Sequence, residues 1–108
     1  MNVLFVCSRN KLRSPTAEAV FASWPGIETD SAGLSSDAEV ELSPDQVEWA
    51  DIIFVMERRH EAKLAQRFGR RVGNKRVVCL DIPDKYGFMD QELITRLEKT
   101  VAPVLRRG

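Results

Sequence analysis

The residues with the clearest chemical potential lie near the start of the chain, where Cys7 and Arg13 bracket a short polar segment. The apolar run 3–6 predicts a buried strand before Cys7. Ser14 and Pro15 are typical of a helix start, with the serine hydroxyl as N-cap and proline at the first helical position. A loop between a strand and a helix N-terminus directs N–H groups at one point, which favours an anion and also a thiolate. One site could therefore bind a phosphate and attack it.

Displacing an alcohol from a phosphate monoester requires a nucleophile, groups that offset the charge on the oxygens, and a proton for the leaving group. The Cys7 thiolate would be the nucleophile. The planar guanidinium of Arg13 can bind two oxygens at once, which a lysine cannot. Ser14 can donate its hydroxyl to the Cys7 sulfur as well as cap the helix. The candidate phosphate-binding residues are Ser8, Arg9, Asn10, Lys11, Leu12, Arg13 and Ser14.

Four strands and four helices are expected to alternate along the chain. The expected strands are 2–7, 27–32, 51–56 and 76–80, and the expected helices are 15–24, 44–49, 58–68 and 90–106. This alternation implies a parallel sheet with right-handed crossovers and helices on both faces, a doubly wound α/β fold. Such sheets bind ligands beyond the carboxyl ends of their strands. We therefore expect the Cys7 loop, Met56-Glu57 and the segment 81–84 to meet at one edge.

Several local signals refine this outline. Ser43-Pro44-Asp45-Gln46 predicts a helix start with a capping box. Gly69 should end the third helix and leave 69–75 as a basic turn, and Pro103 should kink the last helix or end it early.

Asn10, in the middle of the loop, is expected to adopt a left-handed backbone conformation. The only histidine, His60, is expected to be exposed and to have no role, and Cys79 to lie in the core.

The composition indicates one domain, residues 1–108, that is large enough to form a core of its own. Sixteen basic and sixteen acidic residues give no net charge, so no nucleic-acid partner is expected. No apolar run approaches membrane-spanning length and no basic-apolar leader pattern is present, so no membrane association is expected. Two cysteines form neither a disulfide framework nor a zinc site, and reduced cysteines fit a cytoplasmic protein. The sequence makes no prediction of oligomeric state.

The segment Cys7-Ser-Arg-Asn-Lys-Leu-Arg13-Ser14 resembles the C-x5-R-S phosphate loop (P-loop) of low-molecular-weight protein tyrosine phosphatases. The following Pro15-Thr-Ala-Glu-Ala-Val-Phe21 is similar to that family's first helix. Further similar segments are Asp30-Ser-Ala-Gly33, Asp51-Ile-Ile-Phe-Val-Met56 and Asp84-Lys-Tyr86. The resemblance spans most of a chain that is shorter than the usual member. It implies a flavodoxin-like four-stranded sheet and a protein-tyrosine-phosphatase-like hydrolase acting on phosphorylated protein or small molecules.

The same resemblance assigns roles to single residues. It implies that Asp84 is the general acid, although Lys85 stands where the family has proline, and Asp81 is the competing candidate. It implies that Asn10 ties the loop to Ser31, and that Tyr86 forms an aromatic wall of the pocket. The cysteinyl-phosphate mechanism it implies uses no metal and no cofactor.

Departures from the family pattern bear on the substrate. The family usually has glycine at the position of Arg9 and an apolar residue at that of Lys11, and the loop after Gly33 lacks the usual aromatic residue. The loop chemistry is retained, whereas a preference for phosphotyrosine does not follow. Our hypothesis is that the substrate carries further negative charge, bound by cations around the mouth: Arg9, Lys11, Arg58, Arg59 and Lys85.

Two other functions compete with phosphatase activity. An arsenate reductase shares the loop but needs further cysteines for a disulfide cascade, and here Cys79 is the one candidate. A non-catalytic phosphate-binding module could use Arg9 and Lys11 as a clamp. A module that only binds would have no need of Cys7 and Asp84 together.

Overall fold

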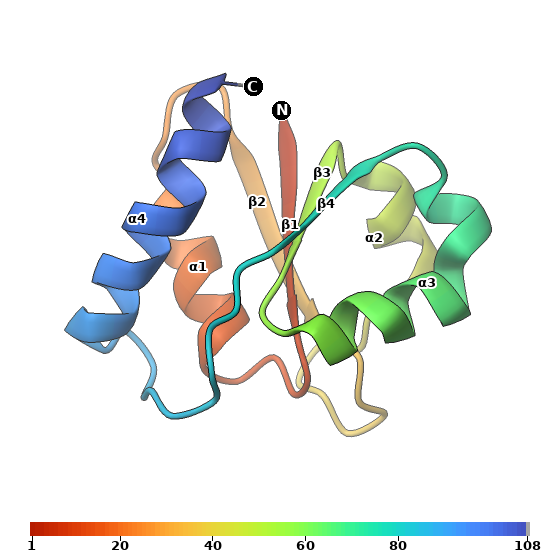
Figure 1. Ribbon diagram of the computed structural model, residues 1–108, viewed down its shortest axis with the longest axis horizontal. Coiled ribbons are helices and arrows are strands. Elements are labelled where there is room, and N and C mark those ends of the chain that lie inside the picture. Colours follow the sequence, from red (N-terminus) through yellow and green to blue (C-terminus); the bar gives the residue numbers. More distant parts are fainter. Residues whose placement is uncertain (108) are drawn as a thin grey trace.

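The computed structural model describes residues 1–107 and contains four strands that alternate with four helices (Figure 1). The elements in chain order are β1 (Asn2–Cys7), α1 (Arg13–Phe21), β2 (Glu28–Gly33), α2 (Pro44–Trp49), β3 (Ile52–Val55), α3 (Arg58–Val72), β4 (Arg76–Cys79) and α4 (Gln91–Arg107). All strand pairs are parallel, in the order β2-β1-β3-β4. The predicted doubly wound α/β fold is confirmed.

The central strand β1 is buried on both faces because a helical layer covers each side of the sheet. Val3, Phe5 and Cys7 belong to the core beneath α1 and α4, whereas Leu4 and Val6 belong to the core beneath α2 and α3. Figure 1 shows these two helical layers on opposite sides of the sheet. A strand covered on both faces needs an unbroken apolar run, which the sequence provides at residues 3–6.

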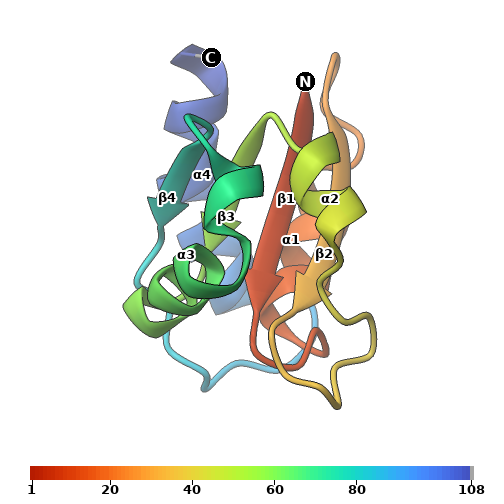
Figure 2. The same cartoon turned by 90° about the vertical axis from the view of Figure 1, so that its right-hand side faces the viewer.

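The carboxyl ends of β1 and β3 mark the point where the chain connections diverge. The chain leaves β1 through α1 towards β2, and it leaves β3 through α3 towards β4 on the other side of the sheet. A crevice forms at such a switch point because neighbouring loops turn to opposite faces. The loops that follow the strands gather at this edge, at the bottom of Figures 1 and 2.

Gly33, at the end of β2, allows the following loop to pack against the segment after β1. A Cβ atom at this position would lie 2.5 Å from the Ser8 carbonyl oxygen and 2.6 Å from the Ala38 Cβ. The loop 34–39 donates three backbone hydrogen bonds, of 2.9 to 3.0 Å, to the carbonyls of residues 7–9. The start of the Cys7 loop is therefore held in place by backbone contacts.

The start of α1 differs from the prediction. The helix begins at Arg13, its N-cap is Leu12, and no side chain caps it. Ser14 lies inside the first turn, so its hydroxyl is not an N-cap and is free for another partner. Pro15 is tolerated there because N–H groups of a first turn have no intrahelical acceptor.

Two further helix predictions are wrong and one is confirmed. The helix α3 does not end at Gly69: its backbone is non-helical at Phe68, and it continues to a C-cap at Gly73, where φ is +53°. The helix α4 runs through Pro103 to its last turn. The capping box at the start of α2 forms as predicted, with Gln46 N–H donating to the Ser43 hydroxyl at 3.2 Å.

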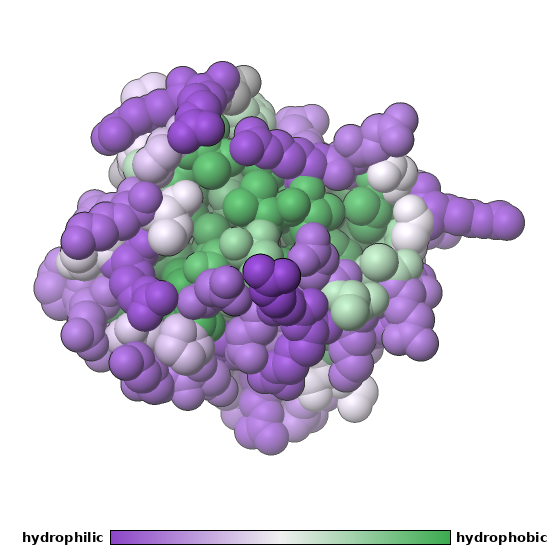
Figure 3. All heavy atoms as spheres, in the orientation of Figure 1, coloured by the Kyte–Doolittle hydropathy of each residue, from purple (hydrophilic) through white to green (hydrophobic). Residues whose placement is uncertain are grey.

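The strand β4 lies at one edge of the sheet and is only partly covered. Its residues 77–79 are half-buried. Figure 3, in the orientation of Figure 1, shows apolar atoms reaching the surface in the middle of the molecule, between the two helical layers.

Within residues 1–107, none of the helices has the length and apolar character needed to cross a membrane.

Candidate active site

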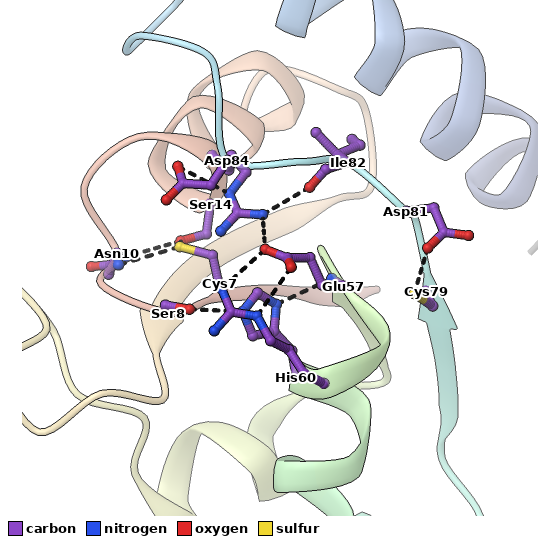
Figure 4. A network of polar contacts seen from close by, with 12 residues as sticks. Cys7, Ser8, Asn10, Ser14, Glu57, His60, Cys79, Asp81, Ile82 and Asp84 are labelled. Carbon is purple, nitrogen blue, oxygen red and sulfur yellow. Dashed lines mark hydrogen bonds and ion pairs between the residues drawn. The ribbon is translucent and has the colours of Figure 1, made fainter.

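The Cys7 sulfur lies at the end of β1 and is surrounded by hydrogen-bond donors. The Asn10 backbone N–H donates to it at 3.2 Å, and the Ser14 hydroxyl oxygen lies 2.9 Å away (Figure 4). Ser14 accepts a hydrogen bond from the Asn10 side chain at 2.9 Å, which leaves its own hydrogen available for the sulfur. Two hydrogen-bond donors are therefore directed at this one sulfur. The predicted contact between Ser14 and Cys7 is present.

A buried polar chain fixes these donors in position. The Asn10 side-chain amide donates to Ser14 and, at 2.9 Å, to the Ser31 hydroxyl on β2, and Ser31 in turn donates to the Glu18 carboxylate on α1. Asn10 has the predicted left-handed backbone, with φ of 57°, and is 4% exposed. The predicted link between Asn10 and Ser31 is therefore present. Glu18, which ends the chain of hydrogen bonds, was not predicted from the sequence.

Arg13 is 2% exposed and is oriented through one of its terminal nitrogens. Its Nη1 donates to a Glu57 carboxylate oxygen at 2.6 Å and to the Ile82 carbonyl at 2.7 Å. These contacts leave the Nε and Nη2 edge of the guanidinium free of hydrogen bonds within residues 1–107. Asp84 lies beside this edge, with its Oδ1 3.7 Å from Nε. A free guanidinium edge next to a thiolate is suited to two oxygens of a tetrahedral oxyanion.

Glu57 is the N-cap residue of α3 and connects two arginines. Its carboxylate accepts hydrogen bonds from Arg59 at 3.0 and 3.2 Å as well as from Arg13. The contacts with Arg59 and then with Arg13 lower the pKa of Glu57 to about 2. Glu57 is therefore a permanent anion at neutral pH and holds Arg13 in position.

His60 is buried, and the prediction that it is exposed is wrong. It is 2% exposed, and its Nδ1 accepts a hydrogen bond from the Glu57 backbone N–H at 3.1 Å. The ring proton is therefore on Nε2, which donates to the Ser8 hydroxyl at 2.9 Å. Because Ser8 accepts this bond, its own hydrogen can point towards the pocket. Burial, and after it the positive charge of Arg13, lowers the pKa of His60 to about 4.

This lowered pKa predicts a loss of stability in mild acid. The unfolded chain, in which histidine has a pKa of about 6.5, binds more protons than the folded chain between pH 6.5 and 4, so stability falls as the pH drops through this window. We expect His60 to contribute about 2 kcal/mol to the difference in unfolding free energy between pH 7 and pH 5. Urea unfolding of wild type and His60→Gln at both pH values measures this. An equal pH dependence of the two proteins would contradict the assignment.

The two candidate acids both follow β4, but their side chains have different surroundings. Asp84 is 59% exposed at its side chain and lines the same pocket as Cys7 and Arg13. Asp81 has a left-handed backbone, with φ of 55°, and its carboxylate points towards Cys79, away from the Cys7 sulfur (Figure 4). Only Asp84 of this pair faces the site.

Tyr86 does not form a wall of the pocket, contrary to expectation. It is 4% exposed, packs in the core with α4, and its hydroxyl accepts a hydrogen bond from Arg96 at 3.3 Å. Lys85 lies over the Tyr86 ring, 5.4 Å from its centre, so this cation is not at the mouth either.

The pocket above the sulfur has a volume of about 390 Å³. Of the five cations expected around it, three line this pocket, and none of its described lining residues is aromatic. The lining residues are Cys7, Ser8, Arg9, Lys11, Leu12, Arg13, Arg59 and Asp84. The sequence thus predicted most of this set. It also placed Glu57 at this edge, but it did not predict the contact of Glu57 with Arg13 or that of His60 with Ser8.

Comparisons with known proteins give one family match and several structures of similar fold. The family model described as low molecular weight phosphotyrosine protein phosphatase matches residues 2–49, which confirms the resemblance seen in the sequence. No curated protein matches the sequence. Residues 2–49 hold β1, the loop and α1, which is the part of the chain that supplies Cys7 and Arg13.

Solved structures of similar fold cover nearly all of the chain. The YwlE arginine phosphatase from Geobacillus stearothermophilus has a TM-score of 0.78 at 23% identity, over 98% of this chain and 94% of that one. The tyrosine phosphatase Wzb from Escherichia coli K30, in complex with phosphate, has a TM-score of 0.80 at 18% identity, over 98% and 96%. Vibrio vulnificus Wzb, in complex with benzylphosphonate, has a TM-score of 0.81 at 20% identity, over 99% of this chain and 98% of that one.

Proposed function

We propose that this chain is a cysteine-dependent phosphomonoester hydrolase. Its first half carries the sequence pattern of the low-molecular-weight phosphatase family, and the whole chain has the fold of the solved phosphatases described above. The observation that carries the proposal is the position of the Cys7 sulfur, between two hydrogen-bond donors and beside a free guanidinium edge of Arg13. A solved structure of a YwlE arginine phosphatase mutant with a phosphorylated active-site serine has the same fold, with a TM-score of 0.81 at 23% identity.

The reaction proceeds in two displacements at phosphorus. The Cys7 thiolate forms a bond to phosphorus while the bond to the leaving oxygen breaks, and Asp84 gives its proton to that oxygen. Arg13 and the loop N–H groups bind the remaining oxygens. A water molecule then attacks the phosphorus of the cysteinyl phosphate while Asp84 takes a proton from that water. The bond between sulfur and phosphorus breaks, inorganic phosphate is released and the thiolate is regenerated.

The substrate class in this proposal is a phosphorylated protein or small molecule, without a commitment to phosphotyrosine. Proteins of the same fold include both arginine and tyrosine phosphatases. The pocket residues include no aromatic side chain that would stack on a phenol ring, and Tyr86 is buried. Small aryl phosphates, which need little beyond the phosphate site, are the appropriate first substrate.

The arsenate reductase alternative requires a disulfide between Cys7 and a second cysteine. Cys79 is on β4, separated from β1 by β3, and it packs on the α2–α3 side of the sheet, whereas Cys7 packs on the other side. Two strand spacings amount to about 10 Å, beyond the reach of a disulfide. This placement disfavours a cascade between these two thiols.

The role of Asp84 is tested by comparing it with Asp81. We expect Asp84→Asn to lower kcat for p-nitrophenyl phosphate by about a hundredfold and to remove the decline of the rate at high pH, because the leaving group loses its proton donor. Asp81→Asn is the matched control, since asparagine tolerates the left-handed backbone at that position, and it should stay within about threefold of wild type. The pH–rate profiles of the three proteins decide between these residues.

A wild-type protein that binds phosphate or vanadate but hydrolyses no phosphate ester would support the binding-module alternative instead.

The proposal also places the protein in the cytoplasm, because both cysteines are free and a nucleophilic thiol needs a reducing compartment.

A further inference from the structure

A second groove opens next to the pocket of Cys7. It lies between the start of the phosphate loop, the turn after β2 and the first half of α3, and it has a volume of about 560 Å³. Ser8, Arg9 and Arg59 line both spaces, so the groove is continuous with the candidate active site. The other lining residues are Leu34, Ser35, His60, Ala62, Lys63 and Gln66.

The walls of this groove are fixed by hydrogen bonds. The backbone N–H of Ser35 donates to the Ser8 carbonyl at 2.9 Å, and Arg67 donates to the Leu34 carbonyl at 2.7 Å. His60 and Ser8 are joined across the groove's inner end at 2.9 Å. A ligand would therefore enter a space whose shape is already formed, with little cost of ordering.

The charge of the groove is positive. Three cations line it, Arg9, Arg59 and Lys63, and no carboxylate does. Arg9 is 65% exposed and forms an ion pair with Asp37 at 3.9 Å, and Arg59 is 64% exposed and forms an ion pair with Glu57 at 3.0 Å, so both charges are partly offset from outside the groove. Lys63 has no carboxylate within 4.0 Å among residues 1–107. His60 is neutral at pH 7 because its pKa is lowered to about 4, so it adds no charge of its own.

We propose that this groove binds an acidic side chain next to the phosphorylated residue of a phosphoprotein substrate. This inference rests on the proposed phosphatase function, since the groove would bind the part of the substrate that lies next to the phosphate in the adjoining site. The methyl group of Ala62, which is exposed on α3, gives a Glu or Asp side chain an apolar surface for its methylene groups, while the cations, above all Lys63, attract its carboxylate. Lys63, which the sequence did not single out, is the cation that belongs to the groove alone.

The test uses two phosphotyrosine peptides that differ only in having Glu or Gln on both sides of the phosphorylated residue. We expect wild type to prefer the Glu peptide by roughly three- to tenfold in kcat/KM at low ionic strength, a preference that shrinks with salt. Each rate is divided by the same variant's rate on p-nitrophenyl phosphate. Lys63→Glu should abolish the preference and Lys63→Arg should keep it. Lys99→Glu, an exposed lysine on α4 on the other side of the sheet, is the matched control and should also keep it.

Binding of both peptides to Cys7→Ser separates the groove from the chemistry. A preference for the Glu peptide in binding, lost in Cys7→Ser/Lys63→Glu, supports the groove even if wild type turns over nothing, in which case the proposed function alone fails. Equal binding of the two peptides, or equal effects of Lys63→Glu and Lys99→Glu, would overturn the groove while p-nitrophenyl phosphate hydrolysis still supported the phosphatase.

Discussion

Replacing Cys7 by serine is expected to lower the hydrolysis of p-nitrophenyl phosphate by about ten thousandfold or more. A serine hydroxyl must lose a proton before it can attack phosphorus. Within residues 1–107, the groups that form hydrogen bonds with the sulfur are the Asn10 N–H and the Ser14 hydroxyl, and neither is a general base that could accept this proton.

The measurement is steady-state turnover together with the far-UV circular dichroism and the phosphate affinity of each variant. Cys79→Ser is the matched control, because it makes the same change in the chain's other free thiol, which lies on β4 away from the pocket. We expect the control to retain activity within about twofold. A folded Cys7→Ser protein that kept a tenth of the wild-type rate would refute a thiol nucleophile.

Arg13→Lys is expected to lower kcat/KM by about a thousandfold, which corresponds to about 4 kcal/mol of transition-state stabilisation and to the loss of two charge-assisted hydrogen bonds. The guanidinium performs two tasks with different atoms. Its Nη1 is held by Glu57 and the Ile82 carbonyl, while Nε and Nη2 remain for the phosphoryl oxygens. A lysine ammonium is a single point and cannot bind Glu57 and two oxygens in the same geometry.

The readouts for Arg13→Lys are kcat/KM and the inhibition constant of vanadate, and both should change by large factors. Arg71→Lys, at the far end of α3 in an exposed pair with Glu48, is the control and should stay near wild type. Equal activities of the two variants would show that Arg13 does not contact the reacting phosphoryl group.

Local patterns in the sequence predicted the order of the strands and helices and the position of the loop, although not every helix end. The apolar run 3–6 could only be a strand buried on both faces, and the alternation of strands with helices required parallel pairing. Cys7, Asn10 and Arg13 were predictable because the loop's geometry depends on residues that are adjacent in the chain. Local signals of this kind carry information over a few residues, the distance over which backbone conformation is correlated.

The contacts that other side chains make with that loop depend on the tertiary structure. Ser14 lies within the first turn of α1 and does not cap it, and Tyr86 turns into the core, where it packs with α4. His60 reads as one polar residue on a charged helix, yet it meets Ser8, 52 residues away. Glu57 meets Arg13 across 44 residues. Such pairs depend on the register of β1 beside β3 and on the crossing of their connections at one edge, and no pattern within either segment records that register.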